Sequence, residues 1–300
     1  MKSILFSDKD FGGAEIYVRN LKKRFNVDFI SIKNNNIFSL LSLIFREDRI
    51  IFHDLRAALL KFLRPLSPDF IVIHGPGKIK LVTKLVVNLL RFLNCEIVLV
   101  SDELFSIFKF KNNLTLLRNF SSFVDVELNK SNKDFIYFGR LENSKGVDLL
   151  YEHWKKNIKD KKLHLIGDGK LYQKYRNAKI PNIIVYGSLP QADIKKIIKE
   201  KCRFYISLSM REGLSLSLLE ALSCGLIPLV VNIPTQNFIQ NDYGFELIDL
   251  ELSNLNKLIF KYREDTFDLI SKKTVNNFSK YSNESSFNTY WKRKINKNKL

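Results

Sequence analysis

The sequence contains few of the residues that build disulfide-rich, disordered or fibrous proteins. Its 300 residues include only three cysteines, twelve glycines and seven prolines. Cys95, Cys202 and Cys224 lie far apart and are odd in number, so they predict neither a disulfide framework nor a zinc site. We interpret them as small buried residues in a reducing compartment. The low glycine and proline content, with 45% hydrophobic residues, excludes a collagen-like or low-complexity chain.

Long apolar runs are also missing. The longest candidate, Lys80–Leu93, is interrupted by two cations and an asparagine, whereas a bilayer span needs about 20 apolar residues. The first residues, Met1–Asp8, lack the apolar core and the small-residue cleavage site of a signal peptide. We therefore expect a cytoplasmic protein whose first residues form a strand.

Acidic residues are too few to balance the basic ones. There are 49 Lys and Arg residues against 31 Asp and Glu, which gives a formal net charge of +18 at pH 7. A field of this sign attracts polyanions, namely nucleic acid, anionic lipid head groups or phosphorylated substrates. The chain has no RNP-like, zinc-finger or aromatic-interleaved basic motif, so we expect no nucleic-acid partner.

Apolar runs of strand length alternate with helix-period segments through most of the chain. The expected strands are Ile4–Phe6, Asp28–Ile32, Ile50–Phe52, Phe70–Ile73, Glu96–Val100, Asp134–Phe138, Leu163–Ile166, Ile183–Tyr186, Phe204–Leu208 and Ile227–Val231. The expected helices are Ala14–Arg24, Asp54–Leu63, Ile79–Leu93, Val147–Asn157, Lys170–Ala178, Gln191–Glu200 and Leu216–Cys224. This pattern predicts parallel sheets covered on both faces, in two doubly wound, Rossmann-like α/β domains.

The predicted boundary between the domains lies within Ser121–Lys133. The segment Asn129–Lys133 contains no apolar residue, so we place an N-terminal domain at 1–127 and a C-terminal domain at 133–273. The remaining stretch, 274–300, is helix-like, aromatic and then basic.

A basic turn follows the strand Asp134–Phe138. Gly139-Arg140 and Lys145-Gly146 lie where this strand ends and a helix begins. Glycines permit a close backbone approach, and a helix N-terminus favours an anion. Arginine and lysine together suit a diphosphate. Taken alone, the motif is explained equally well by two surface cations on a turn.

A second motif follows the strand Phe204–Leu208. Here Glu212-Gly213 precedes an apolar helix that contains Glu220. A carboxylate in a helix made otherwise of Leu, Ala and Ser is costly to bury unless something hydrogen-bonds it, as the diol of a sugar or ribose would. The first turn of this helix can also present N–H groups to phosphate. The alternative is an acid at a helix N-terminus and a glutamate on a polar stripe.

Together these motifs resemble the retaining GT-B glycosyltransferases of family 4 (glycosyl transferases group 1). In that family Gly-Arg-x4-Lys-Gly follows a strand, and Gly-Asp-Gly, a glycine after an apolar strand, and Glu-x7-Glu come next. The matching residues occur here in the same order: Gly139-Arg140, Lys145-Gly146, Gly167-Asp168-Gly169, Gly187-Ser188-Leu189-Pro190, Glu212 and Glu220. The resemblance implies two Rossmann-like domains facing a cleft, with the segment 274–300 packing back on the first.

The resemblance also implies an activity and the residues that perform it. It implies a retaining hexosyl- or N-acetylhexosaminyltransferase that moves sugar from a UDP- or GDP-sugar to a glycan or lipid-linked acceptor in surface polysaccharide biosynthesis. Arg140 and Lys145 would stabilise the leaving diphosphate and Glu212 would bind the transferred sugar, so these three are the expected catalytic residues. The expected donor-binding residues are Gly12, Gly13, Gly139, Gly187, Ser188, Leu189, Gly213, Leu214, Ser215 and Glu220.

The first half of the chain matches that family less closely and is shorter. Gly12-Gly13-Ala14-Glu15 follows the first strand as the family's Gly-Gly-x-Glu loop does, although a glycine-rich turn before a helix explains it equally well. Glu15 and His74, which ends the strand Phe70–Ile73, are the acceptor-side candidates. For His74 we prefer an ordinary structural role. The other histidines show no partner pattern.

Paired carboxylates and basic helices leave two further questions. Asp8-Lys9-Asp10 could hold a divalent cation, as could the pairs Asp125/Glu127 and Asp249/Glu251. We interpret all three as solvated turns and expect no metal or other cofactor. The basic helices Arg19–Arg24 and Ile79–Arg91, with the Lys/Arg-rich tail of the chain, suggest one face that docks on anionic lipid at the inner side of the plasma membrane, or else solvated surfaces.

Other classes of protein remain as alternatives to the transferase. A dinucleotide oxidoreductase needs G-x-G-x-x-G after a strand, which the chain lacks. A nucleotide-sugar epimerase of GT-B fold shares the two-domain architecture. A non-catalytic basic binding protein would also explain the charge.

Overall fold

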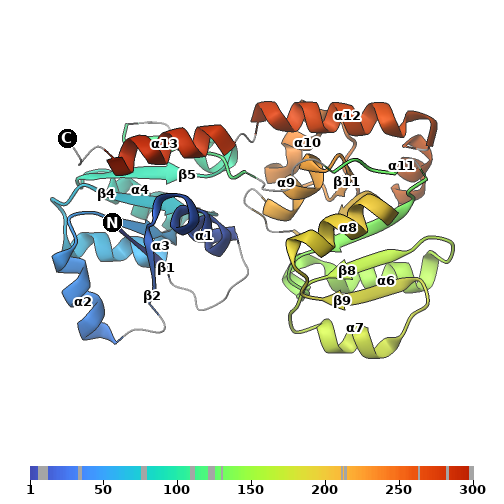
Figure 1. Ribbon diagram of the computed structural model, residues 1–300, viewed down its shortest axis with the longest axis horizontal. Coiled ribbons are helices and arrows are strands. Elements are labelled where there is room, and N and C mark those ends of the chain that lie inside the picture. Colours follow the sequence, from blue (N-terminus) through green and yellow to red (C-terminus); the bar gives the residue numbers. More distant parts are fainter. Residues whose placement is uncertain are drawn as a thin grey trace. The chain divides into compact units, whose positions relative to one another are not determined.

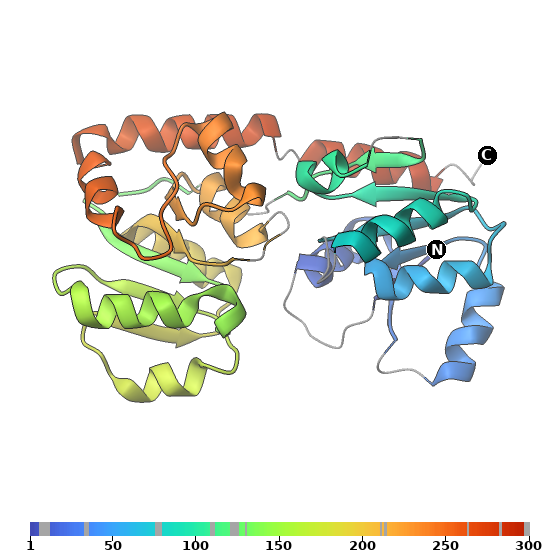
Figure 2. The same ribbon diagram turned by 180° about the vertical axis from the view of Figure 1, so that it is seen from behind.

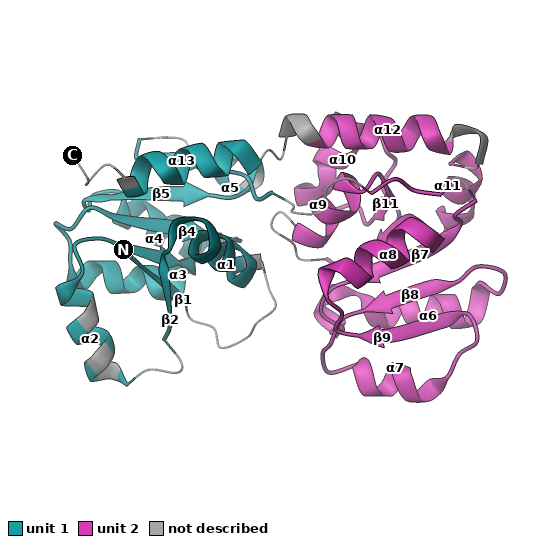
Figure 3. Ribbon diagram, in the orientation of Figure 1, with its two compact units in different colours: residues 1–120, 284–300 teal, residues 121–283 magenta. Residues whose placement is uncertain are grey.

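The chain folds into two compact α/β units. The computed structural model describes residues 1–5, 13–32, 36–75, 80–108, 112–120, 126–129, 131–210, 212, 215–262, 264–281 and 284–296. Unit 1 comprises Met1–Phe120 and Glu284–Leu300, and unit 2 comprises Ser121–Asn283 (Figures 1 and 3). Each is built on one sheet of parallel strands, which confirms the predicted fold class.

Unit 1 contains a six-stranded sheet in the order β2-β1-β3-β4-β5-β6. The strands are β1 (Lys2–Leu5), β2 (Asp28–Ser31), β3 (Ile50–His53), β4 (Asp69–Ile73), β5 (Cys95–Leu99) and β6 (Leu114–Leu116). The helices are α1 (Gly13–Phe25), α2 (Ile37–Arg46), α3 (Asp54–Ala58), the 3-10 helix η1 (Leu59–Leu63), α4 (Lys80–Leu90), α5 (Asp102–Ser106) and α13 (Glu284–Asn296). The chain order reverses between β1 and β3.

The two faces of the unit 1 sheet are covered by different helices. Alternate strand residues point to opposite faces, and those on one face pack with Leu40 of α2 and Val87 of α4. The other face packs with Leu21 of α1 and Trp291 of α13. Accordingly, α1 lies toward the viewer in Figure 1 and α4 in Figure 2. The two basic helices expected to share a docking face therefore cover opposite sides of the sheet, and that part of the prediction is wrong.

Unit 2 contains a five-stranded sheet in the order β11-β10-β7-β8-β9. The strands are β7 (Asp134–Phe138), β8 (Leu163–Ile166), β9 (Ile183–Gly187), β10 (Cys202–Ser207) and β11 (Ile227–Val230). The helices are α6 (Val147–Asn157), α7 (Tyr172–Ala178), α8 (Gln191–Lys201), α9 (Leu216–Ser223), α10 (Asn237–Tyr243), α11 (Leu255–Lys261) and α12 (Glu264–Tyr281), with the 3-10 helices η2 (Asn143–Lys145) and η3 (Pro234–Gln236). One core lies around this sheet.

The division between the units falls at the start of the segment Ser121–Lys133, in which we predicted the boundary, and unit 2 extends beyond the expected limits of 133–273 at both ends. Unit 2 begins at Ser121 because Val126 and Leu128 pack against its core. The Asn132 side chain donates hydrogen bonds to the carbonyls of Ile198 and Lys199 near the end of α8. The apolar-free segment is therefore part of unit 2.

The last stretch of the chain is two helices, of which only the second belongs to unit 1. α12 packs on α9 in unit 2. α13 packs on unit 1 through Phe287 and Trp291, and the Trp291 indole donates to the Tyr17 hydroxyl at 2.9 Å. The packing expected for the whole segment 274–300 therefore begins at Glu284.

Several smaller features of the fold bear on the sequence-based predictions. The helices α2 and α5 and the edge strand β6 were not among the predicted elements. All three cysteines are buried and free, as predicted. Among the described helices, none combines the length and the apolar character required to cross a bilayer.

Candidate functional site

The candidate site lies where the chain order of the unit 2 sheet reverses. From β7 the chain continues to β8 and β9 on one side, and β10 pairs with β7 on the other. In open α/β sheets, ligands bind outside the carboxyl ends of the strands at such a reversal. Gly139-Arg140 follows β7 and Glu212 follows β10, so both sequence motifs meet at this point.

Lys145 and Glu212 form an ion pair across the reversal. Lys145 Nζ lies 2.7 Å from Glu212 Oε1, although the residues are 67 positions apart. The side chains are only 18% and 13% exposed, so water screens the pair less than it would a surface pair. The contact uses one of the three N–H donors of the Lys145 ammonium, so Lys145 can still donate to an anion. It uses only one oxygen of Glu212, so the other oxygen can accept from a hydroxyl.

Arg140 is fixed by its backbone and has an exposed side chain. Its carbonyl accepts a 2.9 Å hydrogen bond from the Tyr137 hydroxyl. Burial raises the pKa of this phenol, so Tyr137 remains a donor. The guanidinium is 45% exposed and contacts Glu142 only at 3.5 Å. The loop therefore presents a cation that can turn toward a ligand without moving its backbone.

Two glycines allow the loops at the site to pack backbone against backbone. Gly146 has φ of 65°, and a Cβ there would overlap the Leu208 carbonyl at the end of the β10 segment. Gly167 has φ of 135°, and a Cβ there would overlap the Gly139 carbonyl. The Leu141 N–H also donates to the Asp168 carbonyl at 2.8 Å. The Gly-Asp-Gly motif thus supports the loop that carries Arg140.

The helix α9 begins at the site with a polar cap. The Ser215 hydroxyl accepts from the Leu218 N–H at 3.4 Å, as an N-cap does. Ser215 and the Tyr205 hydroxyl each lie 3.0 Å from the Ser217 hydroxyl. A chain of hydroxyls therefore connects the end of β10 with the first turn of α9.

Glu220 is buried in α9 and does not lie on an exposed polar stripe. Its side chain is 8% exposed, and burial raises its pKa from the ordinary 4.5 to about 8, against the opposing charge of Lys195. Burial favours the neutral carboxyl, whereas hydroxyl donors would favour the carboxylate. Glu220 is therefore suited to accept from a diol that enters the site.

The remaining donor-side candidates are distributed as follows. Gly187 ends β9, with Ser188 exposed and Leu189 half-buried after it, at the same sheet edge and two strands from β7. The residues Asp8, Asp10, Gly12, Asp125, Arg211, Gly213 and Leu214 lie outside the described part of the chain. Gly13 is the first residue of α1, and Glu15 is half-buried in its first turn.

Two histidines meet at the carboxyl ends of β3 and β4 in unit 1. His53 Nε2 lies 2.6 Å from the Ser3 hydroxyl, and His53 Nδ1 lies 3.0 Å from His74 Nε2. Burial lowers the pKa of both imidazoles, while Asp54 and Glu15 act against it at His74. His74 Nδ1 is buried and has no hydrogen-bond partner in the described structure. Sequence reasoning missed His53, although histidines at the ends of two successive strands were a usable signal.

No metal cluster is present among the residues that the structure describes, where no three His, Cys, Asp or Glu side chains gather around one point. Asp249, from one of the D-x-D-like pairs, accepts from the N–H groups of Ser253 and Asn254. It therefore stabilises the turn before α11.

Comparisons with known proteins identify a family for this part of the chain. Residues 120–245, which include β7 to α10, match the sequence model of the family described as glycosyl transferases group 1. Unit 2 therefore carries a glycosyl transferases group 1 domain. No match to a curated protein was found.

Solved structures with similar folds include known GT-B glycosyltransferases. HepE (Alr3699) of Anabaena, solved with UDP and glucose, is 15% identical over 99% of both chains, with a TM-score of 0.75. Sucrose-phosphate synthase of Thermosynechococcus elongatus is 12% identical over 97% of both chains, with a TM-score of 0.76. S. aureus TarM is 19% identical with a TM-score of 0.64, and the match covers 86% of this chain but only 57–58% of TarM. At such identities the likeness shows the fold, which is that of GT-B glycosyltransferases.

Proposed function

We propose that this protein is a retaining glycosyltransferase that moves a sugar from a UDP- or GDP-sugar to a glycan or lipid-linked acceptor. The observation that carries the proposal is the Lys145–Glu212 pair at the chain reversal of a glycosyl transferases group 1 domain. HepE of Anabaena was solved with UDP and glucose, which supports a nucleotide-sugar donor for this site. Surface polysaccharide biosynthesis at the cytoplasmic side of the membrane is the setting that we propose.

The proposed mechanism rests on stabilising the leaving diphosphate. When the bond to the sugar breaks, negative charge develops on the β-phosphate, and cations already held in place stabilise it without reorganisation. Glu212 holds Lys145 in position, and Arg140 extends from an anchored loop. Both cations would contact the diphosphate, with the first turn of α9 at Ser215 supplying further donors.

The two glutamates have separate proposed roles. Glu212 uses Oε1 for Lys145, so its other oxygen would accept from a hydroxyl of the transferred sugar. The buried Glu220 would accept from the ribose diol, and these donors would return its raised pKa toward the ordinary range. No described side chain is assigned as a general base, because in a retaining transfer the acceptor is expected to attack beside the departing phosphate.

Metal independence is part of the proposal. Two cations beside the diphosphate supply the charge compensation for which other transferases use a divalent ion. Activity should therefore survive exhaustive chelation. A requirement for added Mg²⁺ or Mn²⁺ would contradict this part of the proposal and leave the transferase assignment standing.

The test is a thermal-shift panel with UDP, GDP, ADP and NAD. A ligand at 100 times its dissociation constant stabilises the folded state by about 2.7 kcal/mol. We expect a shift with UDP or GDP that Lys145→Ala removes. A shift with NAD alone, or none with any nucleotide, would contradict the proposal. Turnover of the nucleotide sugar at full rate without an acceptor would instead indicate an epimerase.

A further inference from the structure

Exposed apolar side chains are concentrated on one side of unit 1. They come from α2, from η1 and the turn after it, and from α4 with the residue that follows its last turn. The side chains are Phe38, Phe45, Leu59, Phe62, Leu63, Leu66, Leu81, Val82, Leu85, Leu89 and Phe92. Leu66 and Phe92 are 86% and 88% exposed. Single exposed apolar residues are ordinary, but a contiguous patch of this kind marks an interaction surface.

The helix α4 has two apolar faces. Val87 and Leu90 are fully buried against the sheet. Leu81, Leu85 and Leu89 follow one another at intervals of four residues and are all exposed, so they form a second stripe along the helix. A helix that covers a sheet in water needs only one such stripe. The second stripe is therefore available for another partner.

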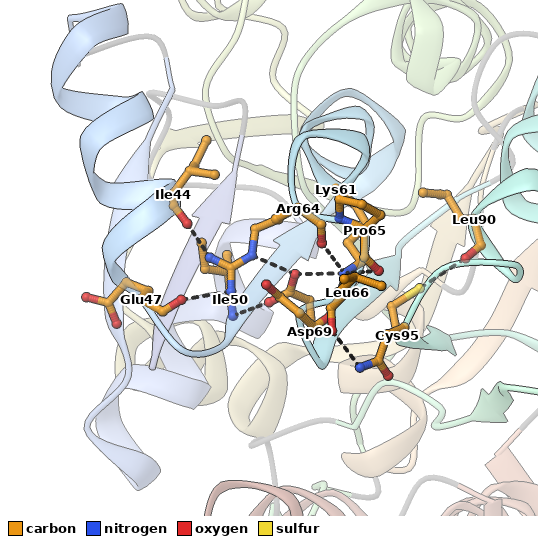
Figure 4. Close-up of polar contacts among 12 residues, drawn as sticks. Ile44, Glu47, Ile50, Lys61, Arg64, Pro65, Leu66, Asp69, Leu90 and Cys95 are labelled. Atoms are coloured by element: carbon orange, nitrogen blue, oxygen red, sulfur yellow. Dashed lines mark hydrogen bonds and ion pairs between the residues drawn. The ribbon is translucent and has the colours of Figure 1, made fainter.

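The helices α2, η1 and α4 are joined at the edge of the sheet where β3, β4 and β5 begin. The Arg64 guanidinium, in the turn after η1, donates to the carbonyls of Ile44 and Glu47 at the end of α2 (Figure 4). On the other side of the turn, Asn94, just after α4, donates to the carbonyls of Pro65 and Leu66. The exposed side chains near these contacts therefore belong to one continuous face, which we name the α2–η1–α4 face.

A buried ion network fixes the shape of this face. Asp69 at the start of β4 contacts Lys61 at 3.1 Å and Arg64 at 2.9 Å, and all three side chains are buried (Figure 4). Lys61 also donates to the carbonyls of Arg64 and Ser67. Breaking a buried pair leaves an uncompensated charge, so the network resists rearrangement. The apolar residues are thus held outward on a rigid support.

The charges exposed on the same elements and on the turns that follow them are mostly basic. Among the described residues of 37–48, 54–66 and 80–92, the exposed charged side chains are the cations Arg46, Arg56 and Lys84 and one acid, Asp48. Glu47, at the end of α2, is partly buried and paired with Lys2 and the N-terminal amine. The partner of this face should therefore combine apolar groups with negative charge.

We propose that the α2–η1–α4 face docks on a lipid bilayer that contains anionic lipid. Phe and Leu side chains would enter the boundary between head groups and acyl chains, and the cations would contact anionic head groups. A second copy of the chain fits less well, because a two-fold interface would place the same cations against one another. This inference rests on the proposed function, because docking on a bilayer would serve the proposed transfer of sugar to a lipid-linked acceptor. The carboxyl ends of the strands, where His53 and His74 lie, stay at the opposite edge of the sheet.

The test compares two matched triple variants of the full chain in vesicle flotation. The face variant replaces Leu66, Leu85 and Phe92 with Ser, and the control variant replaces Leu149, Leu269 and Phe260 of unit 2, which are also exposed. With vesicles of phosphatidylcholine and phosphatidylglycerol, we expect the native protein and the control to float. We expect the face variant to bind at least about tenfold less. Arg46→Gln and Lys84→Gln should each weaken binding about fivefold at low salt.

Three results would overturn the docking proposal. They are absence of native binding to the anionic vesicles, equal binding of the face variant and the control, and a dimer in solution that the face variant abolishes without any vesicle binding. UDP and GDP thermal shifts on the same samples separate this proposal from the proposed function. Flotation without a nucleotide shift supports docking and contradicts the transferase. A nucleotide shift without flotation supports the transferase and contradicts docking.

Discussion

The two units place different chemistry at the same point of similar sheets. Both sheets are parallel, and the chain order of each reverses once, between β1 and β3 in unit 1 and between β7 and β10 in unit 2. In unit 2 the reversal holds the charged, partly exposed pair Lys145 and Glu212. In unit 1 the adjoining strand ends hold the neutral, stacked imidazoles of His53 and His74. The fold supplies the position of a site, and the loop residues supply its chemistry.

The two units also differ in the end of the strands at which they hold paired charges. Unit 1 buries the Lys61–Arg64–Asp69 network at the amino ends of its strands, away from its histidines. Unit 2 keeps its ion pair at the carboxyl ends, where a ligand can reach it. We therefore interpret the first network as support for the unit 1 surface and the second pair as part of a binding site.

Asp69→Asn should have the largest effect on stability. The amide keeps the oxygen that accepts from the Ile50 N–H but leaves the buried Lys61 and Arg64 without a counter-charge. We expect a loss of about 3–5 kcal/mol in the unfolding free energy of unit 1. Trp291 reports on unit 1 and Trp154 on unit 2, so fluorescence of a Trp154→Phe background follows the unit 1 transition alone.

The matched control for this variant is Asp160→Asn. Asp160 is exposed and pairs with its half-buried neighbour Lys161 in unit 2. Its replacement should change the stability by less than about 0.5 kcal/mol. If Asp69→Asn were equally mild, the network would not support the unit 1 surface.

Lys145→Ala should have the largest effect on activity. Removing a group that stabilises transition-state charge lowers the rate by about 100- to 1,000-fold, so kcat/KM for sugar transfer should fall by that factor. Lys156→Ala on α6 removes an exposed lysine and serves as the control. Activity that survives Lys145→Ala and is lost only in variants of unit 1 would move the catalytic site away from the chain reversal of unit 2.

The sequence predicted that the unit 2 motifs meet at one edge of the sheet because short motifs carry them. Gly139-Arg140 directly follows β7, and Lys145 and Glu212 lie in the loops after β7 and β10. The apolar runs of these strands are easy to recognise, and parallel pairing brings their carboxyl ends together. The unit 1 histidines were harder because Ser3, His53 and His74 come from three strands and form no local motif. The Lys61–Arg64–Asp69 network was missed because lysine and arginine are usually exposed, and no spacing rule marks the exceptions.

The α2–η1–α4 face was only partly predictable. The helix Ile79–Leu93 was predicted, but periodicity cannot tell that Leu81 and Leu85 lie opposite Val87, because a helix that is apolar all round looks uniformly buried. The helix α2 was missed although its polar residues Ser39, Ser42 and Arg46 recur at intervals of three and four, which is typical of one helix face. The spacing was a usable signal for this helix.

Glu220→Gln should change the dependence of stability on pH. The pKa of Glu220 is raised from 4.5 to about 8 in the folded state, so the folded protein holds a proton that the unfolded chain releases. The unfolding free energy should therefore fall as pH rises from about 5 through 8, by at most about 1.4 kcal/mol per pH unit. Glu220→Gln should remove this slope, and the exposed Glu200→Gln should not.

Saturating UDP or GDP sharpens this prediction. If a ribose diol donates to Glu220, the carboxylate is stabilised in the complex. The slope between pH 5 and 8 should then become shallower for the native protein and stay unchanged for Glu220→Gln. An equal slope with and without nucleotide would separate Glu220 from the ribose.

His53→Asn should have the smallest effect of these substitutions, a loss in kcat/KM. It should also separate the proposed role of unit 1 in transfer from that of unit 2 in nucleotide binding. His53 contacts none of the residues predicted to bind the nucleotide-sugar donor. Its Nδ1 lies 3.0 Å from His74 Nε2, so it can position the His74 ring. Loss of one buried hydrogen bond corresponds to about tenfold in kcat/KM. We expect that loss in transfer with the UDP or GDP thermal shift intact, because the proposed nucleotide site lies in unit 2. His164→Asn is the control, since His164 makes a similar buried contact with Asp134 inside unit 2. If His53→Asn reduced the nucleotide shift and the transfer rate together, the division of labour between the units would be wrong.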